Sequence, residues 1–544
     1  MQWLKDRPLT VLLLSCIPLF LVHLGELAVN IMEARNFITA REMLVDDNWL
    51  LTTINGEPRY QKPPLPTWLT AFSGALFGLK VWALRLPAAL SAMLLLVFGY
   101  KLHGTLFNNR RQNFWGGLVL ISSFYIIFAG RNGQWDIFTH AFMMVAIYYL
   151  HKLFSESKRL ILYGFLAGLF LAASWMSKGP VSLYALLLPF LIAYGIVYKI
   201  RWHKGLILPI VVLLAVAVIG SGWWFWYTYT YDAATLKAIT EREANNWTSY
   251  NIRPFYYYWS FFTQSGLWTL PAFVALLFPY LRKRVKDPKA YLFSFLWTML
   301  SVVLLSLIPE KKSRYLLPVL IPMAWNTSFY LEYLLDHFKT LTDWKEKVAP
   351  YLHFGLLGTV GLAFPVGGYI LLKDHLSGQW FWFIGLSLSL LTIGFFIWRA
   401  LFKKQLRVAL ICSVVLVMSV ICFGLPMADS LSYNPEYKAL SKLRSWQKEQ
   451  NNLPVYEYDY FTPELIWSYQ GTLPVIKNQG AFFWPEEDSF GVLVAEDHLE
   501  DFLEDFEDYN YAPAGFYDMN PQKKGESGYK TRLARMLFKV SKRY

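Results

Sequence analysis

Residues 64–79 read PLPTWLTAFSGALFGL, and this stretch decides how the chain is threaded through a membrane. It is apolar, but its length leaves open whether it crosses a bilayer, for which a helix needs about 20 residues. If it crosses, every later loop changes side. About 13 other apolar runs are long enough to span, and we place them at 9–29, 83–103, 114–130, 134–151, 160–177, 180–198, 205–228, 258–281, 290–308, 315–335, 351–372, 380–398 and 408–427.

The charge of the loops settles the question. Lys5 and Arg7 favour a cytoplasmic N-terminus, because cytoplasmic loops of membrane proteins carry the excess of Lys and Arg. If 64–79 does not cross, five basic loops fall on the cytoplasmic side, whereas a crossing would put them outside. We therefore predict about 13 spans, with cytoplasmic basic loops at 110–111, 152–159, 199–204, 282–289 and 399–407.

Composition agrees with a multi-span protein and argues against a nucleic-acid binder. The 544 residues are 55% hydrophobic and only 16% charged, and the mean hydropathy is +0.31, whereas about a quarter of the residues of a soluble domain are charged. The net charge of +13 sits in short clusters between apolar runs rather than in one basic stripe. The three cysteines, Cys16, Cys412 and Cys422, lie within apolar runs and predict neither a disulfide nor a metal framework.

This topology leaves three segments outside: about 30–82, 229–257 and everything after 428. We predict a transmembrane domain over 1–428 and a small soluble α/β domain over 429–544. The expected strands are 455–458, 475–476 and 491–495, and the expected helices are 435–449 and 497–506.

Ionisable residues gather on the outer side of the predicted bundle. Such groups are costly beside a membrane and are functional candidates for that reason. Acids and cations share this face, and the loop 309–315 is outside although it is basic, which suggests that it binds an anion. The candidates are Glu33, Arg35, Tyr60, Lys62, Arg131, Asp136, Lys178, Lys311, Lys312, Arg314 and Tyr315.

This set of groups suits the transfer of a sugar from a polyprenyl phosphate. Cations and a tyrosine hydroxyl would stabilise the phosphate leaving group, and a carboxylate would take the proton from the attacking acceptor. Ordinary structural roles are also open. Glu33 could pair with Arg35 or Arg41, Lys62 could mark a surface turn, Lys178 and Arg314 could be snorkelling cations, and Asp136 could pair with Arg131.

Several short motifs occur in one order along the first 330 residues or so, and together they resemble the GT-C family that includes protein O-mannosyltransferases and lipid A aminoarabinose transferases. They are Glu33-x-Arg35 followed by Ala40-Arg41-Glu42-Met43-Leu44, then Asn55 to Pro64 (NGEPRYQKPP), Arg85-Leu86-Pro87, Ser177-Lys178-Gly179-Pro180 and Lys312-x-Arg314-Tyr315-Leu316-Leu317-Pro318.

The resemblance implies an all-α GT-C bundle with an outward cavity in which donor and acceptor meet. It implies that Lys62 contacts the donor phosphate with help from Tyr315, Lys312 and Arg314, and that Asp136 occupies an acidic family position. Two family acids are replaced in this sequence. Met32 occupies the position of the family's favoured catalytic Asp, and Gln61 occupies that of a Glu linked to a metal. We therefore expect no metal or other cofactor, and we favour Glu33 as the base, with Asp136 as the alternative.

The sequence thus predicts transfer of one sugar from a polyprenyl-phosphate donor to an envelope acceptor, with a lipid A-like glycolipid favoured over protein. The expected location is the bacterial inner membrane, with the N-terminus cytoplasmic and the C-terminal domain periplasmic. Two alternatives remain: a transporter or flippase for a lipid-linked sugar, and a membrane scaffold whose site has degenerated. Membrane lipids are expected partners, and nucleic acid is not.

Overall fold

A computed structural model describes residues 7–107, 109–200, 202–431, 434–478 and 480–543. Lys5, on which the predicted orientation partly rests, and Arg201 of a predicted basic loop lie outside these ranges. The chain forms two compact units. The larger comprises 1–26, 60–69 and 80–427, and the smaller comprises 27–59, 70–79 and 428–544.

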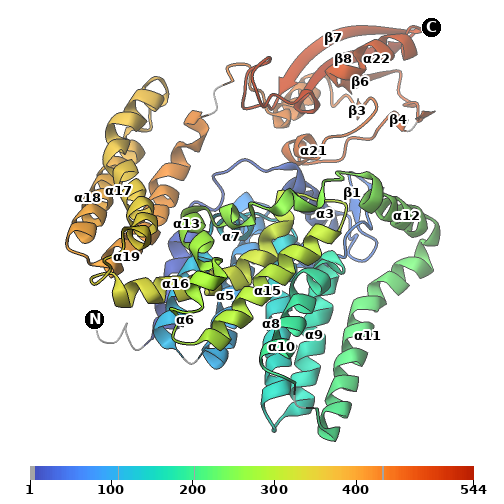
Figure 1. Ribbon diagram of the computed structural model, residues 1–544. Helices are drawn as coiled ribbons and strands as arrows, with labels where there is room; N and C mark the ends of the chain where they lie inside the picture. Colours follow the sequence, from blue (N-terminus) through green and yellow to red (C-terminus); the bar gives the residue numbers. More distant parts are fainter. Residues whose placement is uncertain (1–6, 108, 201, 432–433, 479, 544) are drawn as a thin grey trace. The chain divides into compact units, whose positions relative to one another are not determined.

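The regular elements described in the larger unit are helices joined by loops, and the helices are drawn in Figure 1. They are α2 (Pro8–Cys16), α5 (Val81–Leu106), α6 (Arg110–Ser122), α7 (Phe124–Gly130), α8 (Asp136–Ser155), α9 (Leu160–Lys178), α10 (Leu188–Val197), α11 (Ile207–Tyr231), α12 (Ala233–Ser249), α13 (Thr269–Ala275), α14 (Phe278–Leu281), α15 (Pro288–Leu307), α16 (Leu317–His337), α17 (Trp344–Leu372), α18 (Trp380–Phe402) and α19 (Leu406–Ser419).

The chain is a multi-span membrane protein. Within the described ranges, eight helices are long and apolar enough to cross a bilayer, or nine if α6 and α7, which meet at 63°, form one bent span. The eight contain α5, α8, α9, α11, α15, α17, α18 and α19. The predicted runs 9–29 and 180–198 correspond to shorter apolar helices, Pro8–Leu21 and Leu183–Val197. The ambiguous stretch forms α4 (Leu65–Phe77), which has only 13 residues.

The predicted span 258–281 is not a continuous helix. Residues 258–281 are divided into short 3₁₀ turns, α13 and the four-residue α14. Gly266 sits at φ +60°, in the left-handed region that breaks a helix, and Pro271 and Pro279 restrict the backbone further. The apolar composition of this run led to the prediction of a span, but its Gly and Pro residues stop a single helix from forming.

Close helix packing positions the end of α9. Gly164 and Gly168 form a G-x-x-x-G pair on α9. A Cβ atom on Gly164 would lie 2.2 Å from the carbonyl oxygen of Pro209, and one on Gly168 would lie 2.5 Å from that of Leu213, both in α11. Small residues at this spacing let membrane helices approach backbone to backbone. The side-by-side arrangement of α8, α9 and α11 is visible in Figure 1.

The smaller unit holds a four-stranded mixed sheet with the order β3-β6-β8-β7, in which only the β3–β6 pair is parallel. Its core includes Phe490, Val492, Phe502 and Phe506. Alternate strand side chains form this core because they point to one face. The strands are β1 (Thr53–Ile54), β2 (Glu57–Pro58), β3 (Val455–Glu457), β4 (Lys477–Asn478), β5 (Ala481–Phe482), β6 (Ser489–Val494), β7 (Tyr509–Asp518) and β8 (Ala534–Lys542), and the helices are α3 (Ile31–Val45), α20 (Leu443–Glu449), α21 (Pro463–Tyr469) and α22 (Leu499–Asp505).

The elements predicted after residue 428 differ in detail from those observed. The predicted helix 435–449 is observed only as a 3₁₀ turn followed by α20, and the predicted strand 475–476 is reduced to one bridge between Val475 and Glu457. The long strands β7 and β8 were not predicted.

The first outer segment folds with the C-terminal residues. Arg41 on α3 donates to the carbonyl oxygens of Ile466 (3.5 Å) and Gly471 (3.1 Å). The Asn55 side chain exchanges two hydrogen bonds with the backbone of Leu473, at 2.7 and 2.8 Å. Asn55 and Gly56 both have positive φ, as the tight β1–β2 turn requires. The compact unit is thus larger than the predicted domain 429–544, because it also includes 27–59 and 70–79 from the region of the predicted outer segment 30–82.

Candidate functional site

The N-terminus of α8 and the C-terminus of α9 bring an acidic and a basic side chain together. Asp136 is the first residue of α8 and Lys178 is the last residue of α9, and the two form a buried ion pair. Their side chains are only 7% and 9% exposed. Each charge also suits its helix end, because the N-terminus of a helix favours anions and the C-terminus favours cations.

Arg131 is not the partner of Asp136, although the sequence made it a candidate. Its guanidinium donates to the carbonyl oxygens of Leu19 (3.1 Å) and His23 (2.8 Å), where the first helix ends. No ion pair of Arg131 occurs in the part of the chain that the structure describes. These contacts give Arg131 the role of fastening the first helix, whereas the sequence placed it in the substrate cavity.

The loop 309–315 is organised by an acid that the sequence analysis did not assign. Glu310 Oε1 accepts a hydrogen bond from the Tyr315 hydroxyl at 3.0 Å and an ion-paired one from Lys312 Nζ at 2.6 Å. Lys178 Nζ lies 5.1 Å from the centroid of the Tyr315 ring, which joins this loop to the Asp136–Lys178 pair. The signal that could have pointed to Glu310 is its position as the one acid within the basic stretch 309–315.

Two further contacts fix the loop. The Tyr258 hydroxyl donates to the carbonyl oxygen of Lys312 and accepts from its backbone N–H, both at 3.1 Å. The buried Lys311 ammonium donates to the carbonyl oxygens of Ile308 (2.6 Å) and Arg253 (3.0 Å). Lys311 therefore holds the backbone of the loop together, and Lys312 and Arg314 are left as the loop cations that can meet a ligand.

Arg314 is the distinctive member of the group. It lies close enough to Asp136 and Lys178 to interact with both electrostatically, and its guanidinium carbon is 5.8 Å from the centroid of the Tyr315 ring. Its Nε is buried and has no hydrogen-bond acceptor among the described residues. A buried donor without a partner costs free energy, so this atom indicates a place where a ligand acceptor would fit. We call Asp136, Lys178, Glu310, Lys312, Arg314 and Tyr315 the outer cluster.

Lys62 approaches the outer cluster and is tied to α12. Its ammonium lies 3.4 Å from the Glu243 carboxylate, in a pair whose side chains are about one third exposed, and it interacts electrostatically with Lys178. Two residues earlier, the Tyr60 hydroxyl donates to Asp232 at 2.9 Å, and Asp232 caps the N-terminus of α12. Burial and this carboxylate raise the pKa of the Tyr60 phenol, which keeps its proton. Tyr60 thus anchors α12.

Glu33 and Arg35 belong to the other unit. Glu33 is the third residue of α3 and forms a capping box with Asn30, whose side-chain nitrogen donates to Glu33 Oε2 at 2.8 Å. The carbonyl oxygen of Arg35 accepts from the Arg59 guanidinium at 3.2 Å. A carboxylate has several acceptor positions, so capping α3 leaves capacity for a second role at Glu33.

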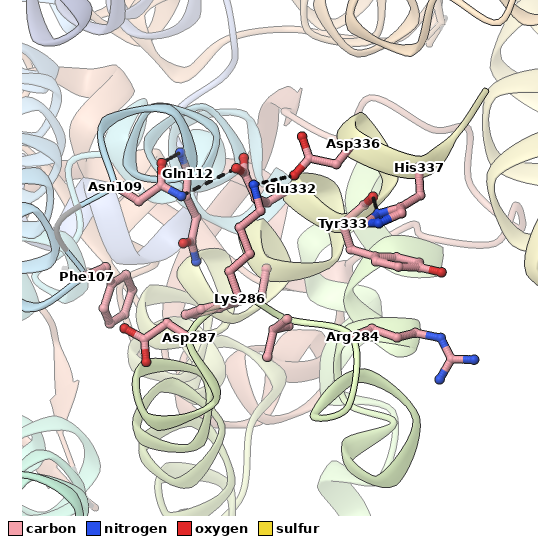
Figure 2. Close-up of a pocket in the computed structure, with 12 residues that line it drawn as sticks. Phe107, Asn109, Gln112, Arg284, Lys286, Asp287, Glu332, Tyr333, Asp336 and His337 are labelled. Atoms are coloured by element: carbon pink, nitrogen blue, oxygen red, sulfur yellow. Dashed lines mark hydrogen bonds and ion pairs between the residues drawn. The ribbon is translucent and has the colours of Figure 1, made fainter. Parts of the chain in front are cut away.

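A second group of charged residues surrounds a cavity of about 140 Å³ at the N-terminal end of α6. Figure 2 shows Asn109, Glu332, Asp336 and Lys286 around it. We call its ion-paired residues the inner cluster: Arg111 with Glu332 and Asp336, Lys286 with Asp336 (2.7 Å), and Arg284 with Glu346 (2.8 Å). Every cation of this cluster has a carboxylate partner.

No group of three or more His, Cys, Asp or Glu side chains suited to a metal ion occurs within the described ranges. Gln61, at the position where the resemblance suggests a metal-linked Glu, has a buried Oε1 with no donor among the same residues.

The sequence and the fold can now be compared with known proteins. The profile of the dolichyl-phosphate-mannose-protein mannosyltransferase family matches residues 61–226. The crystal structure of ArnT from Cupriavidus metallidurans in the apo state superposes with a TM-score of 0.68 at 15% identity, over 99% of this chain and 98% of that one. The chain has the ArnT fold. The ArnT structure bound to undecaprenyl phosphate superposes with a TM-score of 0.64, again at 15% identity and over 99% and 98% of the two chains.

Curated relatives are similar over part of their length. An undecaprenyl phosphate-alpha-4-amino-4-deoxy-L-arabinose arabinosyl transferase from Pseudomonas savastanoi is 26% identical over 313 residues, which are 54% of this chain and 55% of the relative. A protein of the same name from Proteus mirabilis is 24% identical over 74% of this chain and 73% of its own. Together with the ArnT fold, these matches confirm the resemblance to GT-C glycosyltransferases of the aminoarabinose-transferase type.

Proposed function

We propose that this chain is a glycosyltransferase that moves one sugar from a polyprenyl-phosphate donor to an envelope acceptor, with a lipid A-like glycolipid as the favoured acceptor. The observation that carries the proposal is the unpartnered Nε of Arg314 beside the Asp136–Lys178 pair. Oriented cations of this kind stabilise the negative charge that develops on a phosphate leaving group. The relatives named for undecaprenyl phosphate aminoarabinose support the donor class.

In the proposed reaction, an acceptor hydroxyl attacks the anomeric carbon of the donor sugar. The bond from that carbon to the phosphate oxygen breaks, a glycosidic bond forms, and polyprenyl phosphate leaves with the bonding electron pair. Arg314, Lys62 and Lys312 hold the phosphate, and a carboxylate takes the proton of the acceptor. Asp136 is already ion-paired with Lys178, which lowers its availability as a base, so we keep Glu33 as the favoured base.

The first test is an assay of free polyprenyl phosphate with purified protein, an envelope extract as acceptor and a panel of polyprenyl-phosphate sugars that includes the aminoarabinose donor. Wild-type protein releases polyprenyl phosphate from one donor, and the same sugar appears on an extract lipid by mass spectrometry. Lys62→Gln abolishes both signals. Movement of the donor across liposomes without release would support a transporter instead, and neither release nor transport would support a scaffold.

Glu33→Gln separates catalysis from helix capping. Glutamine serves as well as glutamate in a capping box, so the variant keeps the contact with Asn30 and loses only the ability to take a proton. We expect turnover to fall about 10²- to 10⁴-fold, the usual contribution of a general base, with an unchanged melting temperature. Full activity in Glu33→Gln, with loss in Asp136→Asn, would move the base role to Asp136.

We further propose about 13 spans in a bacterial inner membrane, with the N-terminus cytoplasmic and the C-terminal residues periplasmic, because the basic loops then lie inside. A reporter active only in the periplasm, fused after Tyr544, tests the orientation. Activity of the fusion supports an odd number of spans, and an inactive fusion contradicts it.

A further inference from the structure

A cavity of about 480 Å³ lies where α2, α6 and α19 begin, at the end of the larger unit that carries predicted basic loops. Its size is within the roughly 300–1,000 Å³ typical of small-molecule sites. The walls combine apolar side chains with the guanidinium groups of three arginines. The lining includes Arg110, Arg111 and Arg407 together with the apolar Val11, Phe114 and Ile411.

Two of the three arginines have no neutralising partner among the residues that the structure describes. Arg111 is paired with Glu332 and Asp336 in the inner cluster. Arg110 and Arg407 are exposed and, among the described residues, have neither a carboxylate nor another hydrogen-bond acceptor. The cavity therefore presents an excess of about two positive charges beside an apolar wall.

Two further features favour an anion. The helices α2, α6 and α19 all have their N-termini here, and the unpaired N–H groups of a first turn attract negative charge. Trp115 lines the cavity, is only 3% exposed, and its Nε1 has no hydrogen-bond acceptor within the described ranges. Arginines that only obey the positive-inside rule need neither a cavity nor a buried donor without a partner.

The apolar wall decides what kind of anion fits. Phe114, Val11 and Ile411 line the same cavity as the arginines, and Ile411 is 46% exposed. These residues belong to α2, α6 and α19, which the proposed topology starts at the membrane boundary, so a chain of CH₂ groups can lie along them while a phosphate meets the arginines. Basic pockets of this type between membrane helices bind the headgroups of anionic lipids.

We propose that this cavity binds one anionic phospholipid, with its phosphate between Arg110 and Arg407, a hydrogen bond from Trp115 Nε1, and an acyl chain along Val11, Phe114 and Ile411. The site is separate from the outer cluster, because the length of α6 and α7 lies between Arg110 and Arg131, and the proposal does not depend on the transferase activity. On the proposed topology, the lipid comes from the cytoplasmic leaflet.

The test is native mass spectrometry of the detergent-purified full chain, titrated with phosphatidylglycerol or with phosphatidylcholine of the same acyl chains. We expect phosphatidylglycerol to bind at least tenfold more tightly. Arg110→Gln with Arg407→Gln weakens phosphatidylglycerol about thirtyfold, since each basic contact to an anionic lipid contributes about 1 kcal/mol. The matched control, Lys204→Gln with Lys403→Gln, removes two exposed cations that do not line the cavity, one from the predicted basic loop 199–204 and one from the loop 399–407. It changes binding less than twofold.

Trp115→Phe keeps the ring and removes the N–H donor, and we expect it to weaken phosphatidylglycerol about fivefold or more without lowering the melting temperature. Equal losses in the arginine and lysine double variants would mean diffuse attraction and overturn the proposal. Displacement of the lipid by an equal concentration of inorganic phosphate would also overturn it, because the site would then be specific for free phosphate and not for a lipid. Equal affinity for the two lipids would do the same.

Discussion

The outer and inner clusters contain similar residues but differ in whether their cations have acceptors within the protein. In the inner cluster, each cation meets a carboxylate, and Asp336 is shared by Arg111 and Lys286. In the outer cluster, the two lysines are paired, but Arg314 Nε is buried with no acceptor among the described residues. A saturated network fixes helices together, whereas an unsatisfied one retains binding capacity. Among the cations of the two clusters, only Arg314 has a buried donor without an acceptor in the described ranges. This difference, and not the number of charges, marks the outer cluster as the candidate site.

The largest expected effect is the loss of a buried partner. Lys178→Met removes the ion-paired partner of the buried Asp136 carboxylate and leaves it only the weaker interaction with Arg314. We expect the free energy of unfolding to fall by about 3–5 kcal/mol. The matched change in the inner cluster, Lys286→Met, removes a side chain that is 68% exposed while Asp336 keeps Arg111. That change costs less than about 1 kcal/mol. Denaturant unfolding in detergent measures both values, and similar losses would contradict the assigned difference in burial.

The second prediction separates catalysis from stability. Arg314→Gln removes a donor for the leaving phosphate, and we expect kcat to fall about 10²- to 10³-fold with little change in melting temperature. Arg111→Gln should do the reverse: the melting temperature falls because Glu332 and Asp336 lose their shared partner, and kcat stays near the wild-type value. Polyprenyl phosphate release and thermal unfolding are measured on the same preparations. If Arg111→Gln lost activity at a temperature where it is folded, the purely structural role assigned to Arg111 would be wrong.

The sequence predicted part of the outer cluster because the apolar runs are visible in it, and counting the predicted crossings tells which ends of the spans lie on the same side. Asp136 begins one apolar run and Lys178 ends the next, so antiparallel packing of adjacent spans had to bring them to the same face. Arg131 is closer in sequence to Asp136 and was a candidate partner for it, but its guanidinium donates to carbonyl oxygens at the end of the first helix. Nothing in the linear pattern distinguishes these two uses of a buried arginine.

Other features could not be predicted for identifiable reasons. Tyr258 fixes the loop of Lys312 from an aromatic 3₁₀ turn that has no periodicity to read. The union of 27–59 with the C-terminal residues depends on side-chain contacts of Arg41 and Asn55 over more than 400 positions. The break of the run 258–281, in contrast, was indicated by Gly266, Pro271 and Pro279, and a reading that weighed these residues against hydropathy would have found it.

The third prediction uses a matched pair of phenols. Tyr315 donates to Glu310 at 3.0 Å in the outer cluster, and Tyr333 donates to Glu346 at 2.9 Å in the inner one. Tyr315→Phe removes a hydroxyl that orients Glu310 and Lys312 toward the leaving group, and we expect about a tenfold loss in kcat, as for one hydrogen bond to a charged group. Tyr333→Phe should leave kcat unchanged. Equal effects would show that the two phenols have the same structural role.

The smallest expected effect is a pH dependence confined to the inner cluster. Partial burial opposes ionisation of Asp336, but hydrogen bonds from Lys286 and Arg111 outweigh it and hold its pKa below the ordinary value of 3.8. A carboxyl group with a lowered pKa stabilises the folded state above pH 3.8, and this contribution is lost as the pH falls through the lower value. Asp336→Asn should therefore lower the melting temperature at pH 6, and the difference from wild type should narrow below pH 3.8. Because Lys286 and Arg111 already neutralise Asp336 without any ligand, donor lipid should leave this profile unchanged, and a shift on adding donor would mean that the inner cluster takes part in binding.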